Sequence, residues 1–348
     1  MRIGFDAKRA FSNYTGLGNY SRDTIKVLTS FFSENKYFLF TPKKILNPRL
    51  NFIKSQKNLN IISPNNLFNK LFPSYWRTKK IVNDIRFNKI DIFHGLSHEL
   101  PIGIEKTDVK TVVTIHDLIY LRYPEFFTKF DRKIYDKKFR SACKRADKII
   151  AISKQTKKDI IDFFNIHENK IKVVYQGCNE VFKSTKNDDE ISNVKNKFKI
   201  FENYLLYVGA IEKRKNLLTL LESLKNLPNK NLIIIGEGTS YKKECLDFIK
   251  KNKLKNRTKI LSGLNLFEMA CIYQDAEMLI YPSIFEGFGI PIIEALFSKI
   301  PVITSRDGCF KEAGGENSIY INPLSSKEIT NEINNISNDE NFKKKMIE

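Results

Sequence analysis

Residues 277–304 read EMLIYPSIFEGFGIPIIEALFSKIPVIT. This stretch begins with a short apolar run, 277–281, and ends with another, 300–304, and each run is typical of a buried β-strand. A glycine-containing loop follows the first run, and Pro291 then lies at the start of a segment, 290–297, that is predicted to be a helix. A strand, a helix and a second strand in this order predict a βαβ unit with two parallel strands in one sheet.

The same alternation of short apolar runs with longer charged segments continues along the whole chain. Strands of this composition are usually covered by helices on both faces, so the sequence predicts an α/β protein with doubly wound parallel sheets. The other predicted strands are 2–6, 36–40, 59–62, 90–93, 110–115, 147–152, 171–174, 203–209, 231–235, 258–261 and 318–321. The other predicted helices are 18–33, 66–88, 128–145, 153–164, 215–226, 240–252, 266–274 and 326–336.

The length of 348 residues corresponds to about two domains of ordinary size. A polar segment without periodicity, 182–202, lies near the middle of the chain. Each half then holds enough predicted strands for a sheet of its own. We therefore expect an N-terminal domain over residues 1–182 and a C-terminal domain over residues 183–348.

The chain carries 59 Lys and Arg against 39 Asp and Glu, which gives a formal net charge of +20. Such an excess indicates an anionic partner, namely a nucleic acid, a phosphorylated small molecule or an acidic membrane surface. The competing interpretation is a solvated lysine surface, because Lys far outnumbers Arg. The chain contains no recognisable RNA- or DNA-binding motif, so we expect no nucleic-acid partner.

The distribution of cysteine, histidine and apolar residues disfavours several other classes of protein. The five cysteines include no C-x-x-C pair and the four histidines no H-E-x-x-H motif, so we expect neither disulfides nor a bound metal. No run of about 18 apolar residues predicts a transmembrane helix. A strand is predicted from Arg2 onward, so we expect no signal peptide and a cytoplasmic protein, either free or at the inner face of the membrane.

Two glycines follow the first predicted strand, where parallel sheets bind ligands. Gly16 and Gly18 precede a predicted helix and allow a ligand to approach the backbone at the positive end of that helix. An ordinary tight turn is the alternative interpretation of this pair.

Two histidines also follow predicted strands. His116 comes directly after strand 110–115, where it either meets a substrate or is a buried structural residue. His94 follows strand 90–93, and here the structural interpretation is favoured.

Three consecutive cations, Lys213, Arg214 and Lys215, lie between a predicted strand and a predicted helix. They suit a diphosphate that is neutralised without a metal. The alternative is a solvated charge run, but cations at a helix N-terminus oppose the helix dipole and need another explanation. After the next strand, Gly236 begins a second loop that a ligand can approach closely.

Two carboxylates belong to the opening stretch. Glu286 follows a strand and Glu294 lies about one turn inside the next helix, with seven residues between them. The backbone N–H groups around Phe288, Gly289 and Ile290 are expected to face the same ligand. Carboxylates that accept hydroxyl hydrogen bonds, beside amides that stabilise phosphate, predict a site for a sugar joined to a nucleoside diphosphate.

Together these motifs resemble family 4 of the retaining glycosyltransferases, a large group with the GT-B fold that includes mannosyltransferases and glucosyltransferases. Glu286 and Glu294 match the E-x7-E motif of the family, and residues 282–283 with 286–291 match its most distinctive string. The resemblance implies two Rossmann-like domains that face each other across a cleft. The other matching segments are 16–20, 114–118, 209–216, 301–303, 312–314 and 322–323.

For the donor, the resemblance implies that Glu286 contacts sugar hydroxyls near the reaction centre and that Glu294 holds the ribose of the nucleotide. Lys215, together with Arg214, would bind the diphosphate and stabilise it as the leaving group. The backbone around Leu264 would face the nucleobase.

In the first domain, the resemblance places Gly16 and Gly18 beside the donor phosphates. His116 would lie beside the sugar, where it hydrogen-bonds a hydroxyl or orients the acceptor. The expected donor-binding set is completed by Gly236, Phe288, Gly289 and Ile290.

The implied reaction moves a hexose from a nucleotide-diphospho-sugar to a saccharide or a lipid-linked glycan, with retention of configuration and without a metal or cofactor. Attack on the same face, with the departing phosphate as the base, needs no nucleophilic side chain. GDP-mannose is the expected donor, because residues 114–118 and 214–216 resemble a mannosyltransferase-like subgroup. The alternatives are a UDP-sugar donor, a phosphorylase of the same fold, and a basic nucleic-acid-binding protein.

The chain departs from the family pattern at three places. Ala210 stands where many members have Arg, and Lys299 with Ile300 stands where relatives often have a small Gly before the proline. The chain ends at Glu348, short of the helix that crosses back onto the first domain in most members, so we expect a truncated end.

The lysine-rich predicted helices 66–88 and 128–145 have aromatic residues nearby, among them Trp76 and Phe130. They are expected either to dock on an anionic membrane surface or to pack into the first domain.

Overall fold

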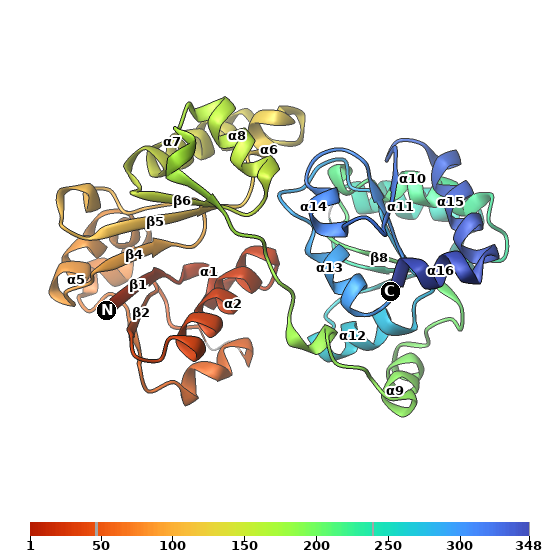
Figure 1. Cartoon of the computed structure of the whole chain (residues 1–348), viewed down its shortest axis with the longest axis horizontal. Coiled ribbons are helices and arrows are strands. Elements are labelled where there is room, and N and C mark those ends of the chain that lie inside the picture. Colours follow the sequence, from red (N-terminus) through yellow and green to blue (C-terminus); the bar gives the residue numbers. More distant parts are fainter. Residues whose placement is uncertain (46–47, 239, 348) are drawn as a thin grey trace. The chain divides into compact units, whose positions relative to one another are not determined.

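The protein folds into two compact units, Met1–Gln176 and Gly177–Glu348. The structure, a computed structural model, describes residues 1–45, 48–238 and 240–347. Each unit is built on a parallel sheet with helices on both faces, which confirms the predicted α/β class (Figure 1).

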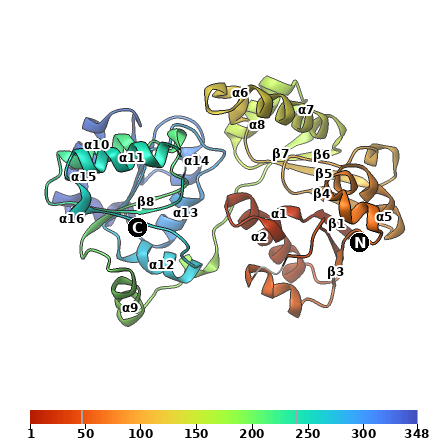
Figure 2. The same ribbon diagram turned by 180° about the vertical axis from the view of Figure 1, so that it is seen from behind.

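The sheet of the first unit has seven strands in the order β3-β2-β1-β4-β5-β6-β7 (Figure 2). The order reverses between β1 and β4, and Ile3 pairs with Tyr37 on one side and with Ile92 on the other. Such a reversal leaves a crevice at the carboxyl ends of the two central strands. The strands are β1 (Arg2–Asp6), β2 (Lys36–Phe40), β3 (Leu59–Ile62), β4 (Ile92–Gly95), β5 (Lys110–Ile115), β6 (Lys148–Ala151) and β7 (Ile171–Val173).

Helices cover both faces of this sheet. In Figures 1 and 2, α1 and α2 lie on one side of the strands and α7 and α8 on the other. The strands are apolar on both faces because each face packs on helices: Phe5 and Leu39 lie in one buried cluster, Phe93 and Val113 in the other. The helices are α1 (Lys8–Ser12), α2 (Gly16–Phe31), α3 (Leu67–Leu71), α4 (Pro73–Tyr75), α5 (Ile81–Phe87), α6 (Ile119–Arg122), α7 (Lys129–Arg145) and α8 (Lys154–Phe164).

The second unit repeats the arrangement with six strands in the order β10-β9-β8-β11-β12-β13, which reverses between β8 and β11. Its strands are β8 (Tyr204–Val208), β9 (Asn231–Ile235), β10 (Thr258–Leu261), β11 (Met278–Tyr281), β12 (Val302–Ser305) and β13 (Ile319–Ile321). All thirteen described strands were predicted, with ends that agree within two residues.

The helices of the second unit also lie on both faces of its sheet. Figures 1 and 2 show α10, α11 and α15 along one side of β8, and α12 and α13 along the other. These helices are α9 (Asp188–Phe198), α10 (Leu217–Lys225), α11 (Ser240–Lys251), α12 (Leu266–Asp275), α13 (Ile290–Phe297), α14 (Phe310–Gly314), α15 (Ser326–Asn338) and α16 (Glu340–Ile347).

The start of the second unit differs from the sequence prediction. Residues 182–202 were expected to lack regular structure, but α9 begins at Asp188 with a capping box between Asn187 and Glu190. The division of the chain falls between Gln176 and Gly177, six residues before the predicted boundary. The turn Glu180–Phe182 belongs to the second unit because the Phe182 ring packs edge-on against Tyr273, with the ring centroids 5.3 Å apart.

The prediction of a single helix over residues 66–88 is also wrong. Pro73 begins a new helix, and the chain continues through α3, α4, a π-helical turn at Trp76–Lys80, and α5. Trp76 has no exposed surface, and its indole N–H donates to the Asp84 carboxylate at 2.7 Å. Trp76 therefore belongs to the core and not to a surface that contacts lipid.

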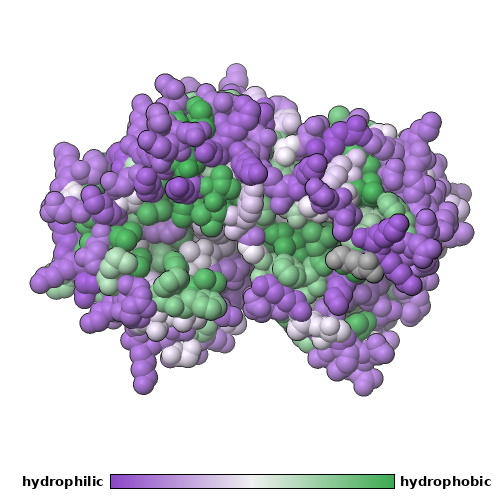
Figure 3. Space-filling view, viewed as in Figure 1, coloured by the Kyte–Doolittle hydropathy of each residue, from purple (hydrophilic) through white to green (hydrophobic). Residues whose placement is uncertain are grey.

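Hydrophilic residues cover most of the face seen in Figure 3, and hydrophobic residues reach the surface only in patches. No helix among the described residues is long and apolar enough to cross a membrane.

Helix α2 begins at Gly16, two residues before the predicted start, so both glycines lie in its first turn. A Cβ atom on Gly16 would meet nothing within 4 Å, whereas one on Gly18 would lie 1.9 Å from the backbone oxygen of Asn13. The Asn13 side chain also accepts hydrogen bonds from the N–H groups of Thr15 and Gly18, at 2.9 and 3.1 Å. Gly18 is therefore required by the packing of this turn, and Gly16 is not.

We expect Gly16→Ala to raise the free energy of unfolding by at most about 0.5–1 kcal/mol, since alanine is the better helix former but Gly16 is the first residue of α2. Gly18→Ala should lower it by about 1–3 kcal/mol, because the added methyl group would overlap the Asn13 carbonyl. Chemical denaturation of both variants beside the unsubstituted chain measures the difference. Equal stabilities of the two variants would contradict this packing.

Candidate functional site

The candidate site of the second unit lies at the carboxyl ends of β8 and β11. These strands are neighbours at the point where the strand order reverses, so the loops that follow them lie side by side. The loop after β8 carries Arg214 and Lys215, and the loop after β11 carries Ser283 and Glu286. The fold thus brings together two of the three predicted cations and one of the two predicted carboxylates.

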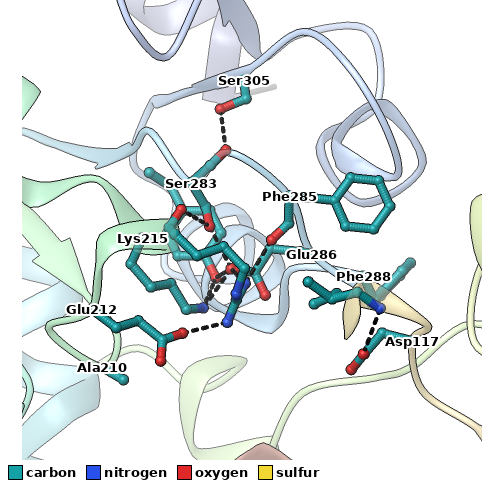
Figure 4. Close-up of polar contacts among 12 residues, drawn as sticks. Asp117, Ala210, Glu212, Lys215, Ser283, Phe285, Glu286, Phe288 and Ser305 are labelled. Carbon is teal, nitrogen blue, oxygen red and sulfur yellow. Dashed lines mark hydrogen bonds and ion pairs between the residues drawn. The ribbon is translucent and has the colours of Figure 1, made fainter. Parts of the chain in front are cut away.

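The Glu286 carboxylate is the centre of this cluster. Its Oε1 atom lies 2.6 Å from Nζ of Lys215 and 2.8 Å from a guanidinium nitrogen of Arg214. The same oxygen accepts hydrogen bonds from the hydroxyl groups of Ser283 at 2.6 Å and Tyr281 at 3.1 Å. Figure 4 shows the Lys215, Ser283 and Glu286 side chains pointing toward one another.

Backbone contacts hold the two loops together. Arg214 donates to the backbone oxygen of Phe285 at 2.6 Å, and its own backbone oxygen accepts from the N–H of Ile284 at 2.8 Å. The Ser305 hydroxyl, at the end of β12, donates to the Ser283 backbone oxygen at 2.5 Å (Figure 4). Three neighbouring strands therefore fix the position of the Glu286 loop.

Charge compensation keeps Glu286 ionised although it is nearly buried. Burial alone would raise the pKa of Glu286, but the charges of Arg214 and Lys215, with hydrogen bonds from Lys215 and Ser283, lower it to about 2. For Lys215, burial lowers the pKa, and the nearby Arg214 acts in the same direction while Glu286 opposes it. The result at neutral pH is a carboxylate held between cations whose side chains are only 12–14% exposed.

Tyr281 and Ser283 take part in this cluster but were not predicted as site residues. Tyr281 accepts a hydrogen bond from Lys215 Nζ at 2.6 Å, and its ring faces that amine at 5.0 Å. Tyr281 ends β11 and Ser283 lies in the loop that follows, and their position three to five residues before Glu286 was the available signal. The hydrogen bonds from their hydroxyl groups to Glu286 could not be predicted from the sequence, because the direction of each side chain depends on the path of the loop.

The N-terminus of α13 follows directly. Gly289 caps the helix with φ = 112°, a left-handed conformation that favours glycine, and Ile290 and Pro291 form the first turn as predicted. Phe288 is buried, and the Cys309 thiol lies 3.1 Å from its backbone oxygen and from that of Glu286. The N–H end of α13 is thus held beside the Glu286 loop.

The second predicted carboxylate, Glu294, has a different partner. It lies in the second turn of α13, is 7% exposed, and accepts a hydrogen bond from the Tyr273 hydroxyl at 2.8 Å. Tyr273 comes from α12, and no sequence pattern connected it with Glu294. The two carboxylates of the motif are therefore held by separate hydrogen-bond partners.

Gly236 and Leu264 lie in other loops at the same edge of the sheet. A Cβ atom on Gly236 would lie 1.9 Å from the Gly209 backbone oxygen, so the loops after β8 and β9 are in close contact. Leu264 is buried and directly precedes Asn265, which caps α12. Packing accounts for glycine at position 236, and the donor contacts of both residues stay predictions.

In the first unit, His116 follows β5 and is 4% exposed. Its Nε2 lies 2.9 Å from the Leu96 backbone oxygen, which only accepts, so Nε2 carries the proton. Nδ1 then accepts from the Gln176 amide at 3.3 Å. Burial, with the nearby His98, lowers the pKa of His116 to about 3, so the ring is neutral at physiological pH.

His94 lies within β4 and joins a buried hydrogen-bond chain. Its Nε2 lies 2.8 Å from the Thr114 hydroxyl, which lies 2.9 Å from the hydroxyl of Tyr20. The Tyr20 ring in turn contacts His116 edge-on, with the centroids 4.7 Å apart. This arrangement agrees with the structural interpretation of His94 and links α2 to His116.

Within the described residues, no three His, Cys, Asp or Glu side chains are grouped so that they could hold a metal ion. All five cysteines are free thiols.

Comparison with known protein families identifies both units. The family described as Glycosyltransferase Family 4 matches residues 33–181, and the family described as Glycosyl transferases group 1 matches residues 188–348.

Curated relatives include two O-antigen enzymes. The chain is 30% identical over 285 residues to the O-antigen chain mannosyltransferase RfbU of Salmonella typhimurium, an alignment that covers 80% of this chain and 74% of RfbU. It is 25% identical to O-antigen chain mannosyltransferase B of Escherichia coli, over 69% of this chain and 63% of that protein. The chain thus spans about two thirds to three quarters of the length of these relatives.

Solved structures share the fold. HepE of Anabaena in complex with UDP-glucose aligns with a TM-score of 0.78 at 18% identity, over 100% of this chain and 92% of that chain. The lipopolysaccharide glycosyltransferase WaaG aligns with a TM-score of 0.73 at 15% identity, over 100% and 93%. The two Rossmann-like units, the two family matches and the similarity to RfbU agree, and the chain belongs to glycosyltransferase family 4 with the GT-B fold.

Proposed function

We propose that this glycosyltransferase is a metal-independent, retaining mannosyltransferase that uses GDP-mannose and a saccharide or lipid-linked glycan acceptor. The observation that carries the proposal is the meeting of Arg214 and Lys215 at the Glu286 carboxylate, beside the N-terminus of α13. Two buried cations and a helix N-terminus provide positive charge for a diphosphate without a metal ion.

The donor would bind by replacing an existing ion pair. Arg214 contacts the Glu212 carboxylate at 2.5 Å, and the Glu212 side chain is 47% exposed. A diphosphate can displace this exposed carboxylate from Arg214 while Glu286 keeps its own contacts with both cations. The second Glu286 oxygen, Oε2, would accept a hydrogen bond from a sugar hydroxyl, and Glu294 would hold the ribose.

In the proposed reaction, an acceptor hydroxyl oxygen forms a bond to the anomeric carbon on the face that the nucleotide leaves. The bond from that carbon to the diphosphate oxygen breaks, and the acceptor proton passes to the departing phosphate. Lys215 and Arg214 stabilise the negative charge that develops on the leaving group. His116, neutral and oriented by Leu96, would accept a hydrogen bond from a hydroxyl at Nδ1 in place of the Gln176 amide, and would orient that hydroxyl without supplying a proton.

The donor base has one specific alternative. The mannosyltransferase names of RfbU and mannosyltransferase B support mannose, whereas HepE was solved with UDP-glucose. A UDP-sugar donor is therefore the second candidate. Docking on an anionic membrane and the lack of a nucleic-acid partner stay predictions.

Thermal unfolding of the full chain with GDP, UDP and ADP distinguishes the two donors. At a concentration one hundred times Kd, a bound nucleotide adds about 2.7 kcal/mol to stability, which is a shift of several degrees. We expect the largest shift with GDP. Stabilisation by UDP alone would exclude GDP-mannose.

Glu286→Gln should lower donor turnover, measured as hydrolysis of the donor in water, by roughly a hundred-fold or more. Nucleotide affinity should stay within a few-fold, because the substitution leaves both cations in place. Glu212→Gln is the matched control, since Glu212 also contacts Arg214 but has no contact with the Glu286 side chain among those described. A Glu286→Gln variant with full turnover would refute the assigned role.

Lys215→Met should weaken nucleotide binding on the order of tenfold or more, as expected for loss of a charge-assisted hydrogen bond. Lys213→Met removes an exposed cation from the same run of three and should change affinity little. Calorimetric titration with GDP measures both variants. Equal losses of GDP affinity in the two variants would favour a solvated run of charges over a specific diphosphate site.

A further inference from the structure

The first unit contains a cavity that the proposed donor site does not use. It has a volume of about 210 Å³, several times the roughly 30 Å³ that one water molecule occupies in the liquid. It lies at the carboxyl ends of β1 and β2, between α1, the loop after β2, the π-helical turn and α7. Its polar lining includes Lys8, Thr41, Lys43, Arg77, Thr78 and Lys138.

The cavity carries an excess of positive charge. Four cations line it, and its described lining contains no carboxylate. Two carboxylates lie behind it: Arg77 contacts Asp6 at 2.5 Å and Glu99 at 3.0 Å, and Glu99 also contacts Lys138 at 3.3 Å. These acids compensate Arg77 and Lys138, so Lys8 and Lys43 add two positive charges to the cavity.

The environment of Lys8 reflects this excess. Burial lowers the pKa of Lys8, and the positive charges of Arg77 and Arg9 lower it further, against the opposing effect of Glu99 and Asp6. A bound anion would remove this repulsion, since an opposite charge within a few ångströms favours the protonated amine.

The cavity is also rigid on the side of Arg77. Arg77 lies in the π-helical turn Trp76–Lys80. Turns of this kind are rare overall, and those that occur are often found at functional sites. The neighbouring Trp76 is fully buried and hydrogen-bonded to Asp84, and the Arg77 guanidinium is held by three hydrogen bonds to Asp6. The cation is thus oriented before any ligand arrives.

We propose that this cavity binds a phosphate group carried by the acceptor. Phosphate is the anion that suits several lysine and arginine donors together with hydroxyl groups. The assignment of this phosphate to the acceptor rests on the proposed function. The binding of phosphate by the cavity does not depend on it.

The position of the cavity fits an acceptor that also reaches His116. Both lie at the carboxyl edge of the same sheet, because Asp6 ends β1 and His116 follows β5. Between them, Glu99 is adjacent to His98, whose ring centroid lies 5.1 Å from that of His116. A sugar attached to a phosphate in the cavity would therefore extend along this edge toward His116.

The surface beside the cavity favours a lipid as the source of the phosphate. Pro73 and Ser74 line the cavity and belong to α4. Around them, the α3–α4 apolar patch consists of five side chains that are between 39% and 73% exposed: Leu67, Phe68, Leu71, Phe72 and Tyr75. An alkyl chain attached to the phosphate would cover this apolar surface.

In the test, the full chain is saturated with GDP. It is then titrated separately with octyl phosphate below its micellar concentration, with glucose 1-phosphate and with inorganic phosphate. GDP occupies the diphosphate site of the second unit, so the titration reports the remaining phosphate site. Lys8→Gln combined with Lys43→Gln removes the two excess charges, and we expect it to weaken phosphate binding on the order of tenfold or more. Lys36→Gln, at the opposite end of β2, is the control and should bind as the unsubstituted chain does.

Phosphate binding of equal strength in the double variant and in the Lys36→Gln control would overturn the proposal. So would binding of the neutral octyl glucoside as tightly as octyl phosphate. Tighter binding of octyl phosphate than of glucose 1-phosphate supports a lipid-linked phosphate, and the reverse order supports a free sugar phosphate. Binding of inorganic phosphate alone, with neither ester, would mean an adventitious ion only and would refute the acceptor site.

The failure of this inference is distinguishable from the failure of the proposed function. The double variant should keep the affinity of the unsubstituted chain for GDP, because Lys8 and Lys43 belong to the first unit and Lys215 to the second. If no nucleotide binds the unsubstituted chain, the proposed donor is wrong. The phosphate titration then runs without GDP, and the comparison of the same variants still decides on the cavity.

Discussion

Glu286 lies nearly buried between Arg214 and Lys215, and this charge cluster sets the requirements for the loops around it. A carboxylate taken out of water is stable only with close cations and hydrogen bonds. The loop after β8 supplies the cations, and the loop after β11 supplies the carboxylate and two hydroxyl groups. The cluster therefore requires that β8 and β11 be neighbours, which is what the reversal of strand order provides.

The same reversal of strand order produces a different environment in the first unit. Around β4 and β5, the buried histidines are neutral, and His116 is held by the Leu96 backbone and Gln176. Around β1 and β2, cations outnumber carboxylates and line a cavity. One sheet edge thus combines a group of buried, neutral histidines with a cavity lined by cations.

Much of the fold could be predicted from short-range patterns. The strands were predicted because both faces of each sheet are covered, so the strands are apolar runs with sharp ends. The helix predicted over 66–88 failed because Pro73 and the buried Trp76 divide it, and the burial of Trp76 depends on residues distant in sequence. Helix α9 was missed because its first turn is polar, although Asn187 and Glu190 form a capping box and Ile191, Val194 and Phe198 recur at helical spacing.

Residue type and spacing identify the groups that can carry the chemistry. Glu286, the run of three cations and the histidine after β5 stand in loops that follow strands, and Glu294 stands in the helix that follows the Glu286 loop. The partners of these residues depend on the tertiary structure. It selected Arg214 and Lys215 over Lys213 as the cations at Glu286, gave Glu294 a separate partner in Tyr273, and placed Arg77 beside Asp6 across 71 residues of chain. A buried charge is stable only beside opposite charges and hydrogen-bond partners that are close in space. The order of the strands brings such residues together although they are far apart in sequence.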